Sequence, residues 1–351
     1  MTAVRDGLAI PEIRMSPDFS TNLRYFPLSE YYRRRFGKRV YKVSVATART
    51  CPNREGIRGM SVCSFCDQWG SAAYEELVGQ PLQTQIARVS ARLRERYKAE
   101  RFLVYFQAYT NTFERISRLE ALFEEALRQP DVIGLVVGTR PDCLPRRMLR
   151  LMSEIARSHY LSVELGVQSL DDDQLNFLSR GHDGACSLAA LESLREYPEI
   201  DVCAHLMFGI PGEDDGQLKE TAAVLSAQGL QGVKLHNLHV LKNTPLARLY
   251  GEGAFAPVSL PEYARKVAVF LEHLAPGVAV HRLNAVASRW EELLAPPWAK
   301  EKLGPTQFIR DYMERVDSWQ GKHYQSGQWY PPPGLPQGGE AAINNGNGKW
   351  G

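Results

Sequence analysis

Short apolar runs alternate with amphipathic segments from about residue 40 to about residue 285 of the chain. The runs are rich in β-branched and aromatic residues, which is typical of strands buried on both faces. They cover residues 40–46, 102–106, 132–137, 160–167, 202–210, 233–240 and, as a candidate seventh, 278–283. We therefore predict one strand in each run.

The segments between the runs carry apolar residues at helical spacing. The clearest example spans residues 119–127, and weaker ones lie around Leu191 and Leu218. Strands that alternate with helices predict βα units and a mainly parallel sheet. About six units fit an α/β fold of the partial (β/α)6, TIM-like barrel type. An open doubly wound sheet fits the same pattern, and the pattern alone does not separate the two.

Two segments lie outside this alternation. We predict an irregular N-terminal extension over residues 1–38, the core barrel over residues 39–290 and a C-terminal extension over residues 291–351. After about residue 330 the chain is rich in Pro, Gly and Asn and poor in core-forming residues, so we expect disorder there.

Composition narrows the class of protein. The chain has 351 residues, 44% hydrophobic and 23% charged, which is typical of a globular protein. No apolar run approaches the roughly 18 residues of a membrane span, and the N-terminus lacks the apolar core of a signal peptide. We therefore expect a cytoplasmic protein without a membrane partner. In that reducing compartment, clustered cysteines indicate metal binding or catalysis rather than disulfides.

The formal net charge of +2 argues neither for nor against nucleic-acid binding. Basic residues do gather between residues 33 and 42, behind Tyr31 and Tyr32. This stretch is either a solvated surface or a phosphate-binding patch.

Three cysteines follow the first predicted strand. Cys63 and Cys66 form a CxxC pair, and Cys51 precedes them across a loop that contains Gly56 and Gly59. Such thiolates suit an iron–sulfur cluster or zinc. Three ligands leave one iron of a [4Fe–4S] cluster open to a small molecule, and the carboxyl end of a strand is where (β/α) proteins place their active sites. Zinc with a distant fourth ligand, a redox pair and plain burial stay open as alternatives.

The remaining cysteines, Cys143, Cys186 and Cys203, are isolated and fit structural positions. Glu164 lies inside an apolar run, which is unusual for a carboxylate unless it is paired or functional. Arg140 and Asp142 follow the third run and are compatible with either a surface ion pair or a functional pair.

Six segments together resemble the radical S-adenosylmethionine (SAM) superfamily, and within it the YhcC-type bacterial proteins and the radical SAM domain of the Elongator catalytic subunit. In order, over about residues 40–250, they are CPNREGIRGMSVCSFC, YFQAYTNT, GTRPDCLP, ELGVQSLDDDQLNFLSRGH, HLMFGIPGE and VKLHNLHVLKNTPL.

The resemblance implies a partial (β/α)6 barrel in which Cys51, Cys63 and Cys66 hold a [4Fe–4S] cluster with SAM on its open iron. The common superfamily spacing is CxxxCxxC, and the longer first gap here is similar to the YhcC-type loop. The implied chemistry is reductive cleavage of SAM to a 5′-deoxyadenosyl radical that removes a hydrogen atom from a substrate. A flavodoxin- or ferredoxin-type partner would supply the electron.

The resemblance also implies a set of SAM contacts. Gln168 and Arg180 match residues that contact the SAM ribose and carboxylate, and His205 stands where some relatives carry a ribose-binding acid. The full set of matched positions is Phe65, Gln107, Thr110, Asn111, Thr139, Glu164, Gln168, Arg180, His205, Gly209 and Leu241.

The substrate is open between RNA, in particular tRNA, and a small metabolite. The Elongator relative modifies a tRNA uridine with an acetyl group supplied by a second catalytic domain, for which this chain has no room after residue 290. A different class of function, a zinc-binding interaction protein on a degenerate radical SAM barrel, is the alternative hypothesis.

Overall fold

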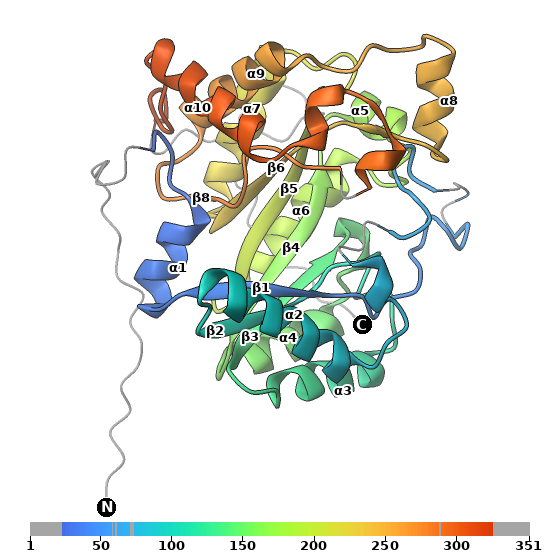
Figure 1. The fold of residues 1–351 in the computed structure, drawn as a ribbon, viewed down its shortest axis with the longest axis vertical. Helices are drawn as coiled ribbons and strands as arrows, with labels where there is room; N and C mark the ends of the chain where they lie inside the picture. Colours follow the sequence, from blue (N-terminus) through green and yellow to red (C-terminus); the bar gives the residue numbers. More distant parts are fainter. Residues whose placement is uncertain (1–22, 58, 60–61, 71–73, 288, 326–351) are drawn as a thin grey trace, which may run out of the picture.

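Seven parallel strands form one curled sheet in the order β1-β2-β3-β4-β5-β6-β8 (Figure 1). The computed structural model describes residues 23–325, apart from residues 58, 60–61, 71–73 and 288. The strands are β1 Val40–Val45, β2 Arg101–Phe106, β3 Val132–Thr139, β4 Tyr160–Gln168, β5 Asp201–Phe208, β6 Gly232–Asn237 and β8 Ala279–Val280. Each of the seven predicted runs therefore contains a strand.

The run at residues 233–240 differs in one respect from the prediction of a single strand. It breaks after β6, and a two-residue strand β7, Val240–Leu241, pairs instead with β9, Leu293–Ala295, in an antiparallel ribbon. This ribbon brings the C-terminal part of the chain to the carboxyl end of the sheet.

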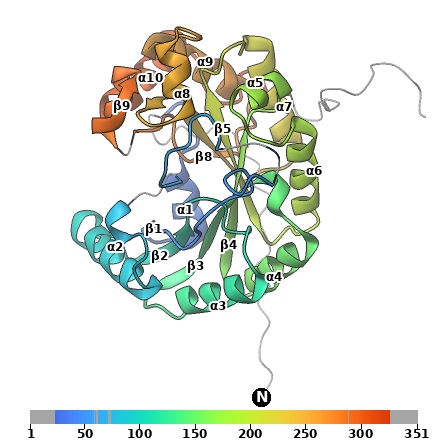
Figure 2. The ribbon, with the colours of Figure 1, turned by 90° about the vertical axis from the view of Figure 1, so that its right-hand side faces the viewer.

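The helices connecting the strands lie on the outside of the curled sheet (Figure 2). They are α2 Leu82–Tyr97, α3 Ile116–Leu127, α4 Arg146–Ala156, α5 Asp172–Phe177, α6 Gly184–Arg195, α7 Asp215–Ala227, α8 Pro245–Gly251 and α9 Leu260–His273. The strands follow one another in chain order with helices on the outer face, which is the half-barrel arrangement and not the doubly wound one. The prediction of a partial TIM-like barrel is confirmed.

Side chains along each strand alternate between two environments. One set, for example Val43 and Leu165, packs against the helices in the main core. The other set points into the lumen, the space enclosed by the curled sheet. Lys42, Glu164 and Lys234 come from three strands that are not neighbours in the sheet, yet both lysines contact Glu164, which is possible only across the lumen.

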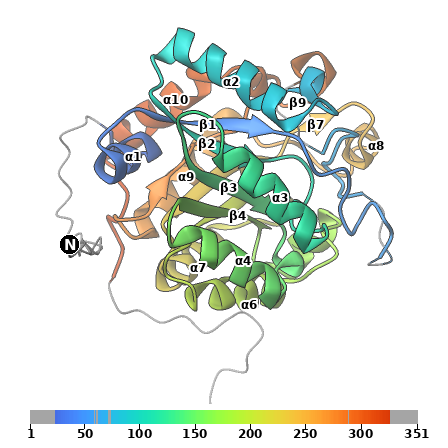
Figure 3. The same ribbon diagram turned by 90° about the horizontal axis from the view of Figure 1, so that it is seen from below.

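The N-terminal extension contains a helix, whereas the sequence predicted an irregular segment. Residues Leu28–Phe36 form helix α1, which lies at the opposite end of β1 from the cysteine loop (Figure 3). Tyr32 and Phe36 pack with Leu103 and Val136, so an apolar plug fills the amino end of the lumen. Just before the helix, Pro27 lies beside Val280 of β8, and Val280 N–H donates to the carbonyl of Phe26.

The basic stretch does not form one exposed patch. Arg33 and Arg34 both bond to Glu30, and Arg35 lies over the ring of Tyr160. Lys42 is inside the lumen and pairs with Glu164. The phosphate-patch interpretation is therefore wrong for Lys42, because alternation along β1 turns its side chain inward.

Within the predicted C-terminal extension, helix α10, Leu303–Arg315, packs against α9 and buries Ile309 and Met313. The residues for which we expect disorder, after about 330, lie outside the described residues. Among the described helices, none combines the length and the apolar character needed to cross a membrane.

Candidate functional site

A cavity of about 380 Å³ opens at the carboxyl ends of the strands. Most of the predicted site residues line it, although they are up to 190 positions apart in the chain. These are Cys51, Cys63, Phe65, Cys66, Gln107, Thr110, Thr139, Glu164, Gln168, Arg180, His205 and Leu241. The fold therefore gathers nearly all of the predicted positions around one space.

Asn111 and Gly209 are the two predicted positions that are not among the cavity-lining residues. The Asn111 side chain donates to the carbonyls of Phe106 and Gly138, at 2.8 and 3.0 Å, and so ties the ends of two strands together. Gly209 has a φ of 84°, and a Cβ there would lie 2.5 Å from Val258. Both residues shape the strand ends from outside the cavity.

The cysteine loop is surrounded by hydrogen-bond donors and cations. Asn53 Nδ2 and Arg180 Nη1 each lie 3.4 Å from Cys63 Sγ, and Arg54 Nη2 lies 3.6 Å from Cys66 Sγ. Burial, reinforced by the neighbouring Cys63, raises the pKa of the Cys66 thiol, while Arg54 opposes this. Donors of this kind stabilise thiolates and tune the clusters that they hold.

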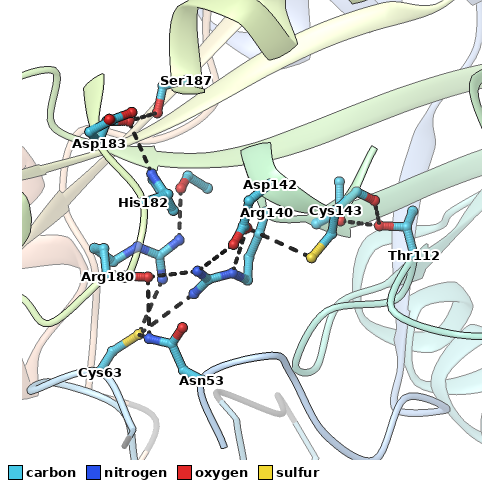
Figure 4. Close-up of polar contacts among 12 residues, drawn as sticks. Asn53, Cys63, Thr112, Arg140, Asp142, Cys143, Arg180, His182, Asp183 and Ser187 are labelled. Carbon is cyan, nitrogen blue, oxygen red and sulfur yellow. Dashed lines mark hydrogen bonds and ion pairs between the residues drawn. The ribbon is translucent and has the colours of Figure 1, made fainter. Parts of the chain in front are cut away.

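Arg140 and Arg180 stand side by side next to Cys63 (Figure 4), but only Arg140 is paired with a described carboxylate. Arg140 makes two bonds to Asp142, at 2.8 and 3.0 Å, and both side chains are buried, so this is not a surface pair. Arg140 also donates to the Arg180 carbonyl at 2.6 Å. Arg180 forms no ion pair with a described residue, and its Nε has no partner among the described groups.

Gly166 makes room for the two residues that the sequence matched to SAM. A Cβ at this position would lie 3.1 Å from Gln168 Nε2 and 3.3 Å from Arg180 Nη2. The pairing of β4 with β5 shifts register between Leu165 and Gln168, and Gln168 has a φ of 69°. Such a left-handed conformation is costly for a residue other than glycine, and it re-aims the Gln168 side chain at the strand end.

Glu164 forms the centre of a buried ionic group in the lumen. Its carboxylate contacts Lys42, Lys234 Nζ at 2.7 Å, His205 Nε2 at 2.6 Å and His281 Nδ1 at 3.5 Å. We call these five residues the Glu164 network. We expected Glu164 to be either paired or functional, and the structure confirms that it is paired. Its partners come from β1, β5, β6 and the segment after β8.

Burial and charge set the protonation states of the Glu164 network. Burial would raise the pKa of Glu164, but Lys234, Lys42 and His205 outweigh it and hold this pKa well below its usual range. Burial, with the nearby charge of Lys234, lowers the pKa of His205 to about 4. Burial also lowers the pKa of Lys234 to about 8, against the attraction of Glu164. At neutral pH, Glu164 and Lys42 are thus charged and His205 is neutral.

Sequence reasoning missed several cavity-lining residues, mainly on β6 and after β8. They are Tyr105, Met207, Lys234, His236, Asn237, His239, Arg282, Ala285 and Val286. One signal was available, because Lys234 and His236 alternate with Val233 and Leu235 and so mark a polar face of an otherwise apolar strand. Arg282 lies inside the candidate seventh run, residues 278–283, so a charged side chain within an apolar run was a signal there as well.

The three loop sulfurs are not all gathered at the spacing of a single zinc ion. Among the described residues, only Glu164, Cys203 and His281 bring three possible ligand atoms within 4.8 Å of one another. At least one pair of the three loop sulfurs is therefore further apart, whereas tetrahedral zinc would hold thiolates about 3.8 Å apart. A cubane cluster binds each thiolate through a different iron, which suits the wider spacing.

The set of Glu164, Cys203 and His281 belongs to the ion-pair network. The Lys42 ammonium contacts Glu164 and lies 3.3 Å from His281 Nδ1, so a cation already occupies this position. Cys203 Sγ lies 3.3 Å from the same nitrogen, and Cys203 is buried, as predicted from its apolar run.

Comparisons with known proteins agree with this geometry. Residues 45–225 match the Radical SAM superfamily, and residues 230–315 match the Radical_SAM C-terminal domain. The chain is 34% identical to YtqA of Bacillus subtilis over 88% of this chain and 95% of that protein. It is also 34% identical to YhcC of Escherichia coli, over 86% of this chain and 94% of that one.

One solved structure with a similar fold is Elp3 of the archaeon Methanocaldococcus infernus, with a TM-score of 0.63 and 18% identity. The match covers 81% of this chain and 64% of that one. A tRNA uridine(34) acetyltransferase of Dehalococcoides mccartyi is 34% identical over 36% of this chain, but over only 27% of its own length.

Replacing Glu164 by Gln should strongly destabilise the fold. The change leaves Lys42 and Lys234 buried without their counter-ion, and we expect a loss of about 3–5 kcal/mol in the free energy of unfolding. Glu196→Gln is the matched control, because Glu196 pairs with Arg146 on the surface and should cost about 1 kcal/mol or less. Urea unfolding measures the free energy of unfolding of both variants against the wild type. Equal losses in the two variants would contradict the buried network.

Replacing His205 by Gln should reduce the acid sensitivity of the fold. The pKa of His205 is about 4 in the folded chain and near 6.5 in the unfolded chain, so below about pH 6.5 only the unfolded chain gains the proton. Stability should fall as the pH drops, and His205 alone should account for about 1 kcal/mol between about pH 7.5 and about pH 5.5. Urea unfolding at both pH values should show that the free energy of unfolding falls less with pH in His205→Gln than in the wild type. An equal fall in the two proteins would refute the lowered pKa of His205.

Proposed function

The chain belongs to the radical SAM superfamily, and on that premise we propose that Cys51, Cys63 and Cys66 hold a [4Fe–4S] cluster and that the adjoining cavity binds SAM. The observation that carries the proposal is the junction of the three cysteines with the unpaired guanidinium of Arg180 on one cavity wall. Three thiolates leave one iron for a ligand with a carboxylate, and a guanidinium is the matching partner for that carboxylate.

A [4Fe–4S] cluster held by Cys51, Cys63 and Cys66 would, once reduced, supply one electron for the cleavage of SAM to methionine and a 5′-deoxyadenosyl radical, and that radical would take a hydrogen atom from the substrate to give 5′-deoxyadenosine. The electron comes from outside the chain, and a flavodoxin- or ferredoxin-type protein is the proposed donor. The enzyme class follows from the family. RNA and a small metabolite both stay proposals for the substrate.

The chain's own residues have four tasks in this proposal. Arg180 holds the SAM carboxylate, and Gln168, turned by its left-handed backbone, reaches the ribose. Phe65 packs at the adenine, with the Arg180 guanidinium 6.0 Å from its ring centroid. Asp67 and Arg289 form a buried ion pair between the cysteine loop and the C-terminal segment, which shields the cavity mouth from water.

Cys63→Ala should abolish cluster binding and SAM cleavage, because it removes one of three thiolate ligands. The test is anaerobic reconstitution with iron and sulfide, reduction with dithionite and measurement of 5′-deoxyadenosine by mass spectrometry. Cys186→Ala is the control, since Cys186 lies on α6 and does not line the cavity. A colourless wild-type protein with stoichiometric zinc would instead support the zinc-binding interaction hypothesis.

Arg180→Gln should weaken SAM binding by about tenfold or more, the expected cost of losing a charge-assisted contact to a carboxylate. Equilibrium dialysis of radiolabelled SAM against the reconstituted enzyme measures the dissociation constant. Arg180→Lys keeps the positive charge but loses the two-pronged guanidinium. Its affinity for SAM should therefore lie between those of Arg180→Gln and the wild type. Iron content is determined in parallel, because Arg180 also contacts Cys63. Unchanged SAM affinity at full iron content would remove Arg180 from the SAM site.

A further inference from the structure

Arg282, in the segment after β8, brings a second unpaired guanidinium to the cavity. Its Nη2 lies 2.5 Å from Nδ1 and 2.8 Å from Nε2 of His236, and its Nε has no hydrogen-bond partner in the described part of the chain. No described carboxylate forms an ion pair with it. Burial lowers the pKa of Arg282, although Tyr105 and Glu164 act in the opposite direction. A guanidinium that lines a cavity, half-buried and without a counter-ion, is costly, which indicates that its partner is a ligand.

Asn237 lines the same cavity and carries a second donor without a described partner. Its Oδ1 accepts the Ala285 N–H at 2.8 Å, which fixes the orientation of the amide. The Nδ2 group is buried and has no partner among the described residues, and the residue is only 1% exposed. Asn237 ends β6 and Arg282 follows β8, and these two strands are neighbours in the sheet.

The acids near the cavity are already engaged elsewhere. Glu164 pairs with Lys42 and Lys234, and Asp142 pairs with Arg140. Asp67, which lines the cavity mouth, pairs with Arg289. The cavity therefore has positive charge and hydrogen-bond donors in excess.

His236 and His239 do not supply the missing charge. Burial lowers the pKa of His239 to about 4 and that of His236 well below its usual range, so both rings are neutral at physiological pH. The neutral His236 ring can accept a hydrogen bond from Arg282 through its unprotonated nitrogen, but neither ring can neutralise the guanidinium.

We propose that Arg282 and Asn237 form a subsite for an oxyanion, a carboxylate or a phosphate, carried by the substrate. Naming the substrate as the occupant rests on the proposed function. SAM is not the occupant, because its carboxylate is assigned to Arg180, which contacts Cys63 and follows β4 and α5, whereas Arg282 follows the edge strand β8. A guanidinium fork with an added amide N–H is suited to the two or three oxygens of such a group.

The test is the thermal unfolding midpoint of the reconstituted holoenzyme saturated with SAM, in sodium phosphate, sodium acetate or sodium chloride of equal ionic strength. Phosphate or acetate should raise the wild-type midpoint by about 2 °C above chloride. A response to phosphate alone identifies a phosphate-bearing substrate, and a response to acetate alone identifies a carboxylate-bearing one. Arg282→Gln should lose the response, whereas Arg146→Gln, on the exposed surface of α4, should keep it.

A second variant covers the case in which Arg282→Gln does not fold. Asn237→Asp keeps the acceptor for the Ala285 amide but adds a negative charge to the subsite, so it should also lose the anion response. The proposal is overturned if the wild type shows the same midpoint in all three salts, or if the response survives in Arg282→Gln or Asn237→Asp. SAM cleavage by the wild type is measured separately. Its failure would overturn the proposed function, whereas the anion response needs no electron transfer and still tests the subsite.

Discussion

Glu164 places a negative charge inside the lumen of a sheet that does not close on itself. The two edge strands, β1 and β8, are not hydrogen-bonded to each other, yet Lys42 from β1 and His281 from the end of β8 both reach the same carboxylate. An ion pair from Lys42 and a polar contact from the neutral ring of His281, whose pKa burial lowers to about 3, therefore bring the two free edges to one carboxylate, where a full barrel would use backbone hydrogen bonds. A charge so deeply buried is tolerated only because its partners are fixed around it.

This network separates two regions of the lumen. Toward the amino ends of the strands, α1 contributes Tyr32 and Phe36 to an apolar plug. Toward the carboxyl ends, the wall becomes polar and holds the cavity with the three cysteines. The half-barrel thus has a dry base, an ionic middle layer and a functional rim, in keeping with the way parallel (β/α) folds place stability and chemistry at opposite ends.

The rim is assembled from both halves of the chain. Ser64 in the cysteine loop donates its N–H to the Leu178 carbonyl and accepts the Leu246 N–H. The β7–β9 ribbon and the ion pair of Asp67 with Arg289 bring the C-terminal segment to the same loop. The loop that we assign to the cluster is therefore held by contacts over more than a hundred positions, and its position depends on the folded core.

The sequence by itself determined the strand runs and the cysteine triad, because these depend on local hydrophobic pattern and on spacing within one loop. The choice of a half-barrel over an open doubly wound sheet came from the resemblance of its motifs to a known family and not from the pattern. The same resemblance predicted most of the rim residues, several of which are polar side chains at strand ends. Only the tertiary structure decided that Lys42 is buried, that Arg140 and Asp142 pair inside the protein, and that Asn111 and Gly209 stand outside the cavity. It alone revealed the unpaired Arg282, because charge balance depends on which groups the fold brings together, and no local pattern encodes contacts between residues so far apart in the chain.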